Sequence, residues 1–261
     1  MIATLEQMIR RDRLTALVCV SVVTALAWIG LLTMSSSMDG TGADGRLQAA
    51  MSMTDPRVWG VADWLGLSGM WAVMMTGMMV PSVSPVLLHM LQIFRRRGDR
   101  LAHKSAAAFV GGHLAAWILF GAVAAAVQIA LHRAALLDAS VAIRSTALTG
   151  ALLLAVGIYQ CLPVKSACLT RCRPPLRFLS MKRRDGTLGA LTMGLQHGGF
   201  CVACCFALMA LMFVAGVMNV FWAAAIAVLV LAEKLTPRRL HLEYASGLPL
   251  IAWGVVKLVQ P

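Results

Sequence analysis

A row of soft-metal ligands lies inside a long apolar segment at residues 193–209. If this segment is a helix with about 3.6 residues per turn, side chains four positions apart share one face. The row that results consists of Met193, His197, Cys201, Cys205 and Met209, with Cys204 beside it. Thiolate, thioether and imidazole groups favour Cu(I) above all and zinc next. The segment therefore predicts a metal site, with copper as the first candidate and zinc as the alternative.

A second row of ligands lies in an earlier apolar segment, where five methionines occur within ten residues at Met70, Met74, Met75, Met78 and Met79. Methionine also fills hydrophobic cores well, so packing is the alternative to metal binding. Pro81 and Pro85 follow the row and should bend the helix or open its backbone, because proline removes a helical hydrogen bond.

A third group of ligands is predicted in a basic connection on the cytosolic side. On a helix, Cys168 and Cys172 would share one face. The nearby Lys165, Arg171 and Arg173 would favour the thiolate form that a metal requires. A basic helix on the membrane surface with incidental thiols is the alternative. We interpret His113, in another apolar segment, as a helix-packing residue, and we expect Glu233 to pair with Lys234 or a loop arginine.

The composition is that of an integral membrane protein. Hydrophobic residues make up 59% of the chain and charged residues 13%, which is too apolar for a soluble domain. The formal net charge is +12, but the basic residues lie between apolar runs, as in cytoplasmic loops, so we expect no nucleic-acid partner. The 7 cysteines lie mostly in apolar or predicted cytosolic segments and do not indicate a disulfide framework.

Several apolar stretches approach the about 20 residues that a helix needs to cross a bilayer. They cover residues 14–34, 65–93, 105–131, 141–162, 188–215, 220–235 and 244–259. With the N-terminus inside and the C-terminus outside, 18 of the 23 basic residues fall on the cytoplasmic side and 5 outside or at the outer boundary. We therefore predict an all-α, multi-pass protein with about seven transmembrane helices. The first stretch is longer than a cleavable signal segment, so we interpret it as a retained helix.

The chain divides into two predicted parts. Residues 1–64 would form the first transmembrane helix and an extracytoplasmic loop that contains Met38, Met51 and Met53. Those methionines could capture Cu(I), but a linker that happens to contain methionines is the favoured interpretation. Residues 65–261 would form a six-helix membrane domain. Aligning Gly69 with Gly199 superposes the methionine segment on the cysteine segment, which suggests a three-plus-three inverted repeat after the first helix.

The chain resembles an uncharacterised bacterial family of predicted metal-binding integral membrane proteins. The resemblance runs from about Gly69 to Lys234 and rests on several motifs together. These are the methionine run at 70–81, Tyr159-Gln160, the Lys-x-x-Cys-Leu-x-x-Cys-Arg-x-Pro run at 165–175, the Gly-x-x-Cys-x-x-Cys-Cys run at 198–205, residues 216–219, and Glu233-Lys234. Ala203 and Phe206 depart from the family pattern, which often has glycine and tryptophan there. The resemblance implies a metal-binding protein of the bacterial cytoplasmic (inner) membrane.

Three functions remain open at this point. The first is binding and transmembrane transport or delivery of a soft transition metal, with a metallochaperone or a metalloenzyme assembly partner. Cu(I) is favoured because the ligands are methionine, cysteine and histidine. The second is a membrane thiol–disulfide oxidoreductase that uses Cys201 and Cys204. The third is a non-catalytic membrane assembly factor. We expect a transporter or metal-binding protein rather than an enzyme. The oxidoreductase alternative would make the protein an enzyme.

Overall fold

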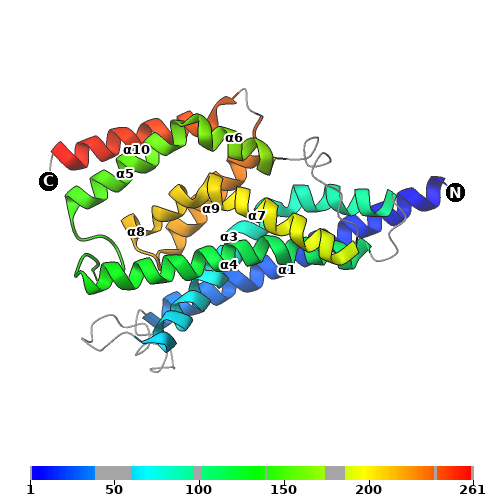
Figure 1. Ribbon diagram of the computed structural model, residues 1–261, viewed down its shortest axis with the longest axis horizontal. Helices are drawn as coiled ribbons and strands as arrows, with labels where there is room; N and C mark the ends of the chain where they lie inside the picture. The colour runs from blue at the N-terminus through cyan, green and yellow to red at the C-terminus, as the bar shows by residue number, and fades with distance from the viewer. Residues whose placement is uncertain are drawn as a thin grey trace.

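The computed structural model describes residues 2–38, 60–96, 102–138, 140–173, 186–237 and 240–259, apart from the side chains at 2–10, 37, 38 and 96. Over these ranges the protein is helical, with one isolated bridge between Leu137 and Ile143, so the predicted all-α class is confirmed there. Figure 1 shows the elements in chain order: α1 (Ile2–Met38), α3 (Val61–Arg96), α4 (Ala102–Arg133), α5 (Thr146–Cys161), α6 (Pro163–Cys172), α7 (Gly186–Ala210), α8 (Met212–Ala215), α9 (Val220–Leu235) and α10 (Leu242–Val259).

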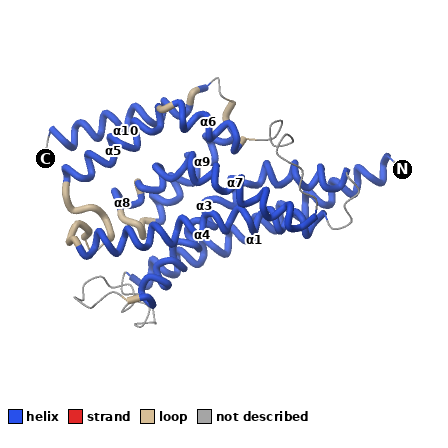
Figure 2. The backbone as a smooth tube through the Cα atoms, in the orientation of Figure 1, coloured by secondary structure: helices blue, strands red, loops and turns tan. Residues whose placement is uncertain are grey.

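The helices form two groups. In one group, α1 packs on α3, α3 on α4 and α4 on α7. In the other group, α5 packs along α10, and both are set apart from the first group in Figure 1. The short helix α6 follows α5 and packs against α7, which connects the two groups. The tube in Figure 2 makes plain how few loop residues separate the described helices.

Five helical segments are long and apolar enough to cross a membrane. They are Arg11–Ser36, Val61–Arg95, Ala102–Arg133, Gly186–Ala215 and Leu242–Val259. The pair Thr146–Cys161 and Pro163–Cys172 would be a sixth if it counts as one span, although it is bent by 64°. α9 has 16 residues, fewer than the about 20 that a straight span requires. Seven spans, the orientation and the division at residue 64 therefore stay predictions, and the methionine loop lies largely outside the described residues.

The predicted fourth span, residues 141–162, contains one helix, α5, which begins five residues later than predicted and ends before the bend at Pro163. Residues 141–145 precede the helix, and the Ser145 side chain accepts a hydrogen bond from the backbone N–H of Leu148 to cap α5. Leu162 is extended, with φ −74° and ψ 143°, and Pro163 begins α6. This is the local chemistry that ends a helix, because a residue before proline disfavours the helical region and proline suits a first helical turn. The bend turns α6 toward α7.

α3 continues as one helix through Pro81 and Pro85. Because Pro85 has no N–H, the carbonyl of Pro81 lacks its helical donor, and the Ser84 hydroxyl donates to that carbonyl at 2.7 Å. The Ser82 hydroxyl donates to the Met79 carbonyl at 2.8 Å. These serines keep the backbone hydrogen-bonded in an apolar surrounding, where an unsatisfied group costs several kcal/mol.

α4 and α7 approach each other closely at glycines. A Cβ atom on Gly194 would lie 1.9 Å from the carbonyl oxygen of Phe109, and one on Gly112 would lie 2.1 Å from the carbonyl oxygen of Leu191. Neither position accepts a side chain without moving backbone. Small residues at such contacts are typical of helices that pack in membranes. The close approach brings the following turn of α7, which carries His197 and Cys201, against α4.

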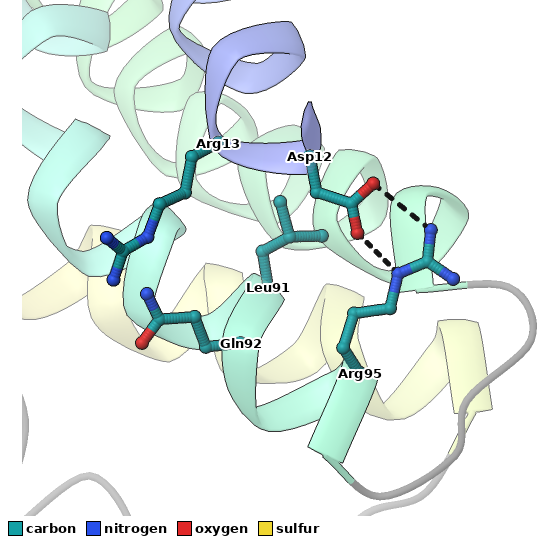
Figure 3. Close-up of a pocket in the computed structure, with 5 residues that line it drawn as sticks. All are labelled: Asp12, Arg13, Leu91, Gln92 and Arg95. Carbon is teal, nitrogen blue, oxygen red and sulfur yellow. Dashed lines mark hydrogen bonds and ion pairs between the residues drawn. The ribbon is translucent and has the colours of Figure 1, made fainter. Parts of the chain in front are cut away.

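An ion pair joins the N-terminal helix to the rest of the bundle. The Asp12 carboxylate accepts from the Arg95 Nε at 2.5 Å, and the Nε2 atom of His103 lies 3.0 Å from its other oxygen. These contacts connect α1, α3 and α4. Figure 3 shows the small pocket beside them, where Leu91 lies between the arginines. A larger, mainly apolar cavity of about 570 Å³ lies between the same helices and does not include the α7 cysteines.

We predict that Gly194→Ala separates α4 from α7 and lowers the melting temperature of the detergent-solubilised protein by several degrees. The physical reason is overpacking, which costs about 1 to 3 kcal/mol, and about 1 kcal/mol shifts the midpoint by a few degrees in a chain of this size. Gly199→Ala is the matched control, because its Cβ would meet nothing within 4 Å. Equal melting temperatures for the two variants would contradict the close packing of α4 on α7.

Candidate metal centre

Four cysteine side chains from α6 and α7 meet in one buried cluster, which we call the sulfur cluster. Its members are Cys172, Cys201, Cys204 and Cys205, each at most 2% exposed. The Sγ of Cys204 lies 3.2 Å from that of Cys205 and 3.6 Å from that of Cys172. The Sγ of Cys204 also donates to the backbone oxygen of Cys201 at 3.2 Å. All four cysteines are free thiols.

The two helices that carry the sulfur cluster, α6 and α7, are consecutive in the chain and are fixed against each other. The Nε2 atom of His197 lies 3.4 Å from the backbone oxygen of Cys172. The Tyr159 hydroxyl donates to the backbone oxygen of Ala203 at 2.5 Å, and its ring packs edge-on against Phe206. The guanidinium of Arg171 lies 4.9 Å from the centre of the Phe200 ring. These contacts place Cys172 over the cysteines of α7.

A lysine ammonium points into the sulfur cluster. Lys234, near the end of α9, is 5% exposed. Its Nζ donates to the Sγ of Cys201 at 2.9 Å and to the Ser82 hydroxyl at 2.8 Å. This is the geometry of an ammonium–thiolate pair. The contact also connects α9 to α3 and α7.

The neighbouring Glu233 has a different partner from the one predicted. Its carboxylate accepts from the Lys165 Nζ at 2.6 Å, and both side chains are at most 1% exposed. Gln160 donates to the same carboxylate at 2.9 Å and Ser246 at 3.3 Å. Glu233 thus pairs with neither Lys234 nor a loop arginine, because adjacent helical residues point in different directions. Lys165 had been expected to lie beside the thiols. It pairs with Glu233 instead.

Arg173 completes this charged network. Pro237 has no N–H to donate to the carbonyl of Glu233, four residues before it. The Arg173 guanidinium donates to that carbonyl instead, at 2.6 Å, and lies 3.5 Å from the Glu243 carboxylate. The end of α9 is therefore held by α6 and α10.

The histidine of the predicted row, His197, faces another histidine. Its Nδ1 lies 3.2 Å from the Nδ1 of His113, and both residues are at most 1% exposed. His113 was interpreted as a packing residue, and its contact with His197 accounts for one nitrogen. The Nε2 of His113 is buried without a hydrogen-bond partner in the described part of the chain. His113 is thus a further soft-ligand candidate beside α7.

The predicted methionines of α3, together with Met209 of α7, are buried in the core that contains the sulfur cluster, whereas Met193 is only partly buried and packs against a second core. Met70, Met74, Met75, Met78, Met79 and Met209 are each at most 3% exposed and belong to that core. The hydroxyl of Ser82, which accepts from Lys234, lies 3.8 Å from the Sδ of Met79. Met79 is therefore connected to Cys201 through Ser82 and Lys234. The burial fits both metal binding and packing, so these two readings stay open.

The sequence prediction grouped some residues that the structure separates. Cys168 is only partly buried and packs at the edge of the core, whereas Cys172, one turn later, belongs to the sulfur cluster. Among the described side chains, no group of three or more His, Cys, Asp or Glu residues is arranged as a ready-made metal site. The roles of the predicted ligands stay predictions.

The partners of Glu233 and Lys234 were not predicted, because they are remote in the sequence. The available signal was the pair Glu233 and Lys234 at the end of an otherwise apolar stretch. Charges inside apolar helices normally pair or serve function. That rule calls for partners, but the choice of Ser82 and Cys201 for Lys234 requires the packing of α3, α7 and α9.

Together these features define a protein that is helical over the described residues, with several helices of membrane-spanning length and a buried cluster of cysteines. A family model described as PpoB2, copper chaperone, matches residues 68–257. The chain therefore belongs to the PpoB2 copper chaperone family. The match covers all four cysteines of the sulfur cluster, Lys234 and the methionine row of α3. Comparison with curated proteins and with solved structures found no match.

We predict that Lys165→Met destabilises the protein by about 3 to 5 kcal/mol, because it leaves the Glu233 carboxylate buried without its cation. Adding Glu233→Gln in the same chain should recover most of that loss. Thermal unfolding in detergent measures both effects. Arg95→Met is a control with a smaller expected loss, because the Arg95 side chain is 19% exposed. A Lys165→Met protein as stable as the wild type would contradict the pairing.

Proposed function

We propose that the protein binds Cu(I) in a bacterial cytoplasmic membrane and delivers it to a metalloenzyme assembly partner. The observation that carries the proposal is the sulfur cluster, in which Cys172 of α6 meets three cysteines of α7. Membership of a copper chaperone family supports copper as the ion. Copper is the cargo in this account and not a resident cofactor.

The donor chemistry of the sulfur cluster fits a soft ion. Thiolates and thioethers select Cu(I), whereas carboxylate and carbonyl oxygens suit harder ions. Glu233, the carboxylate next to Lys234, is a hard oxygen donor, but it is already paired with Lys165. Two sulfurs that share a metal at the about 2.3 Å of a zinc–thiolate bond lie about 3.8 Å apart in a tetrahedron. The 3.6 Å between Cys172 and Cys204 is close to that separation.

The methionines of α3 provide a route to the sulfur cluster. From Met70 to Met79 the helix rises about 14 Å, at 1.5 Å per residue. Thioethers hold Cu(I) without losing a proton, so an ion can move between them before it reaches thiols, which bind as thiolates. Met79 lies at the end of the row connected to the sulfur cluster. We propose that copper is passed along this row and held at the cysteines.

Release would take place through α6. This helix has 10 residues, follows the bend at Pro163, and carries Cys172 in its last turn. Movement of α6 would withdraw one sulfur from the cluster and weaken its hold on the ion. If copper is delivered to a partner at α6, the ion need not cross the whole membrane. Transport across the bilayer is the broader proposal. In the predicted inverted repeat, with spans two to four as one half and spans five to seven as the other, α3 and α7 would be equivalent helices.

The oxidoreductase alternative, with Cys201 and Cys204 as the reacting pair, fits the structure less well than metal binding. Thiol–disulfide exchange needs access of a partner disulfide to a thiolate. Both cysteines are at most 1% exposed, and the sulfur of Cys204 contacts those of Cys205 and Cys172. A copper ion needs only a narrow path to such a cluster, whereas a partner's disulfide needs an opening. Burial therefore favours metal binding.

The proposal is tested by copper analysis of protein purified anaerobically under reducing conditions. Wild-type protein loaded with Cu(I) and freed of excess ion should retain stoichiometric copper. A Cys201→Ser, Cys204→Ser, Cys205→Ser triple variant should lose it, and Cys172→Ser should lose most of it, because each change replaces a soft sulfur by a hard hydroxyl. Elemental analysis against protein concentration gives the ratio.

The matched control is the double variant Cys19→Ser, Cys161→Ser, which removes two free thiols outside the sulfur cluster. It should retain copper, as should Cys168→Ser. Retention of copper by the triple variant would refute the sulfur cluster as the site. No copper in the wild type, together with thiol labelling that changes with redox state, would favour the oxidoreductase.

A further inference from the structure

The Lys234 ammonium is a buried positive charge whose contacts are with a thiol and a hydroxyl. The Nζ atom lies 2.9 Å from the Sγ of Cys201 and 2.8 Å from the Ser82 hydroxyl. No ion pair between Lys234 and a carboxylate occurs among the residues described. A buried charge without an opposite charge is strongly unfavourable. The group placed to supply a matching negative charge is the sulfur of Cys201, at 2.9 Å from the ammonium.

The number of sulfurs that can converge on one ion limits the charge of a loaded site. The charge can be counted for one pair of sulfurs from the two helices, such as Cys172 and Cys204, whose Sγ atoms lie 3.6 Å apart. Two thiolates around a monovalent ion carry a net charge of minus one. The Lys234 ammonium brings that assembly to zero. Two thiolates around a divalent ion are neutral already, and Lys234 would leave them with an unmatched positive charge.

We propose that Lys234 is the fixed counter-cation of the sulfur cluster, and that it makes the site selective for the monovalent ion Cu(I) over the divalent ion Zn(II). This inference rests on the proposed function. Lys234 acts through its charge and is not a ligand. The hydrogen bond to Ser82 holds the ammonium in place. The neighbouring Glu233 pairs with Lys165, so it does not neutralise Lys234.

The test compares Cu(I) and Zn(II) dissociation constants of the full-length, detergent-solubilised protein, measured anaerobically by competition with chromophoric chelators. Lys234→Gln removes the charge but keeps a hydrogen-bond donor for Ser82 and Cys201. It should weaken Cu(I) binding about tenfold or more, which corresponds to about 1.4 kcal/mol, and leave Zn(II) binding unchanged or tighter. Lys234→Met should do the same, and Lys234→Arg, which keeps the charge, should restore the wild-type preference.

A purely structural role for Lys234 would weaken the binding of both metals together. A ratio of Cu(I) to Zn(II) affinity that is unchanged in Lys234→Gln and Lys234→Met would therefore overturn the inference, and so would failure of Lys234→Arg to restore it. Melting temperatures show which variants are folded, and the two neutral variants give independent readings. If the wild type binds no Cu(I), the proposed function itself fails. If the wild type binds Cu(I) and the neutral variants keep its selectivity, this inference alone fails.

Discussion

Two adjacent side chains of opposite charge end α9, and both are almost fully removed from solvent. Glu233 finds Lys165 on α6, while Lys234 finds Cys201 on α7 and Ser82 on α3. Unpaired, either charge would be strongly destabilising in apolar surroundings. The requirement to pair both determines how α3, α6 and α7 are arranged around the end of α9. It also places a positive charge beside the cysteines, which gives the site its chemical character.

The glycine contacts between α4 and α7 are the complementary constraint. They allow the backbones to touch at Gly112 and Gly194, so that the histidines of the two helices meet and the cysteines of α7 turn toward α6 and α9. The bend at Pro163 supplies the last component, because a straight continuation of α5 would not direct Cys172 toward α7. Packing by small residues and a proline break thus assembles ligands from separate helices, and the buried ion pairs fix their positions.

Local sequence patterns were sufficient for the helical class and for most helix positions. The row of cysteines on one helical face was predicted from spacing alone, and the structure brings Cys201, Cys204 and Cys205 together. The predicted stretch 141–162 ends where α5 ends, before Pro163, but it begins five residues before the helix does. What the sequence could not supply was partner choice. The pairing of Glu233 with Lys165, the position of Lys234 beside Cys201, and the separation of Cys168 from Cys172 all depend on packing between remote segments.

The central claim is that the buried sulfurs of α6 and α7 hold copper in its monovalent state. X-ray absorption at the copper edge of the loaded full-length protein tests it most directly, because the edge reports the oxidation state and the fine structure reports the neighbouring atoms. The account predicts Cu(I) surrounded by sulfur atoms alone. Copper bound only by nitrogen and oxygen atoms, or present as Cu(II), would contradict it.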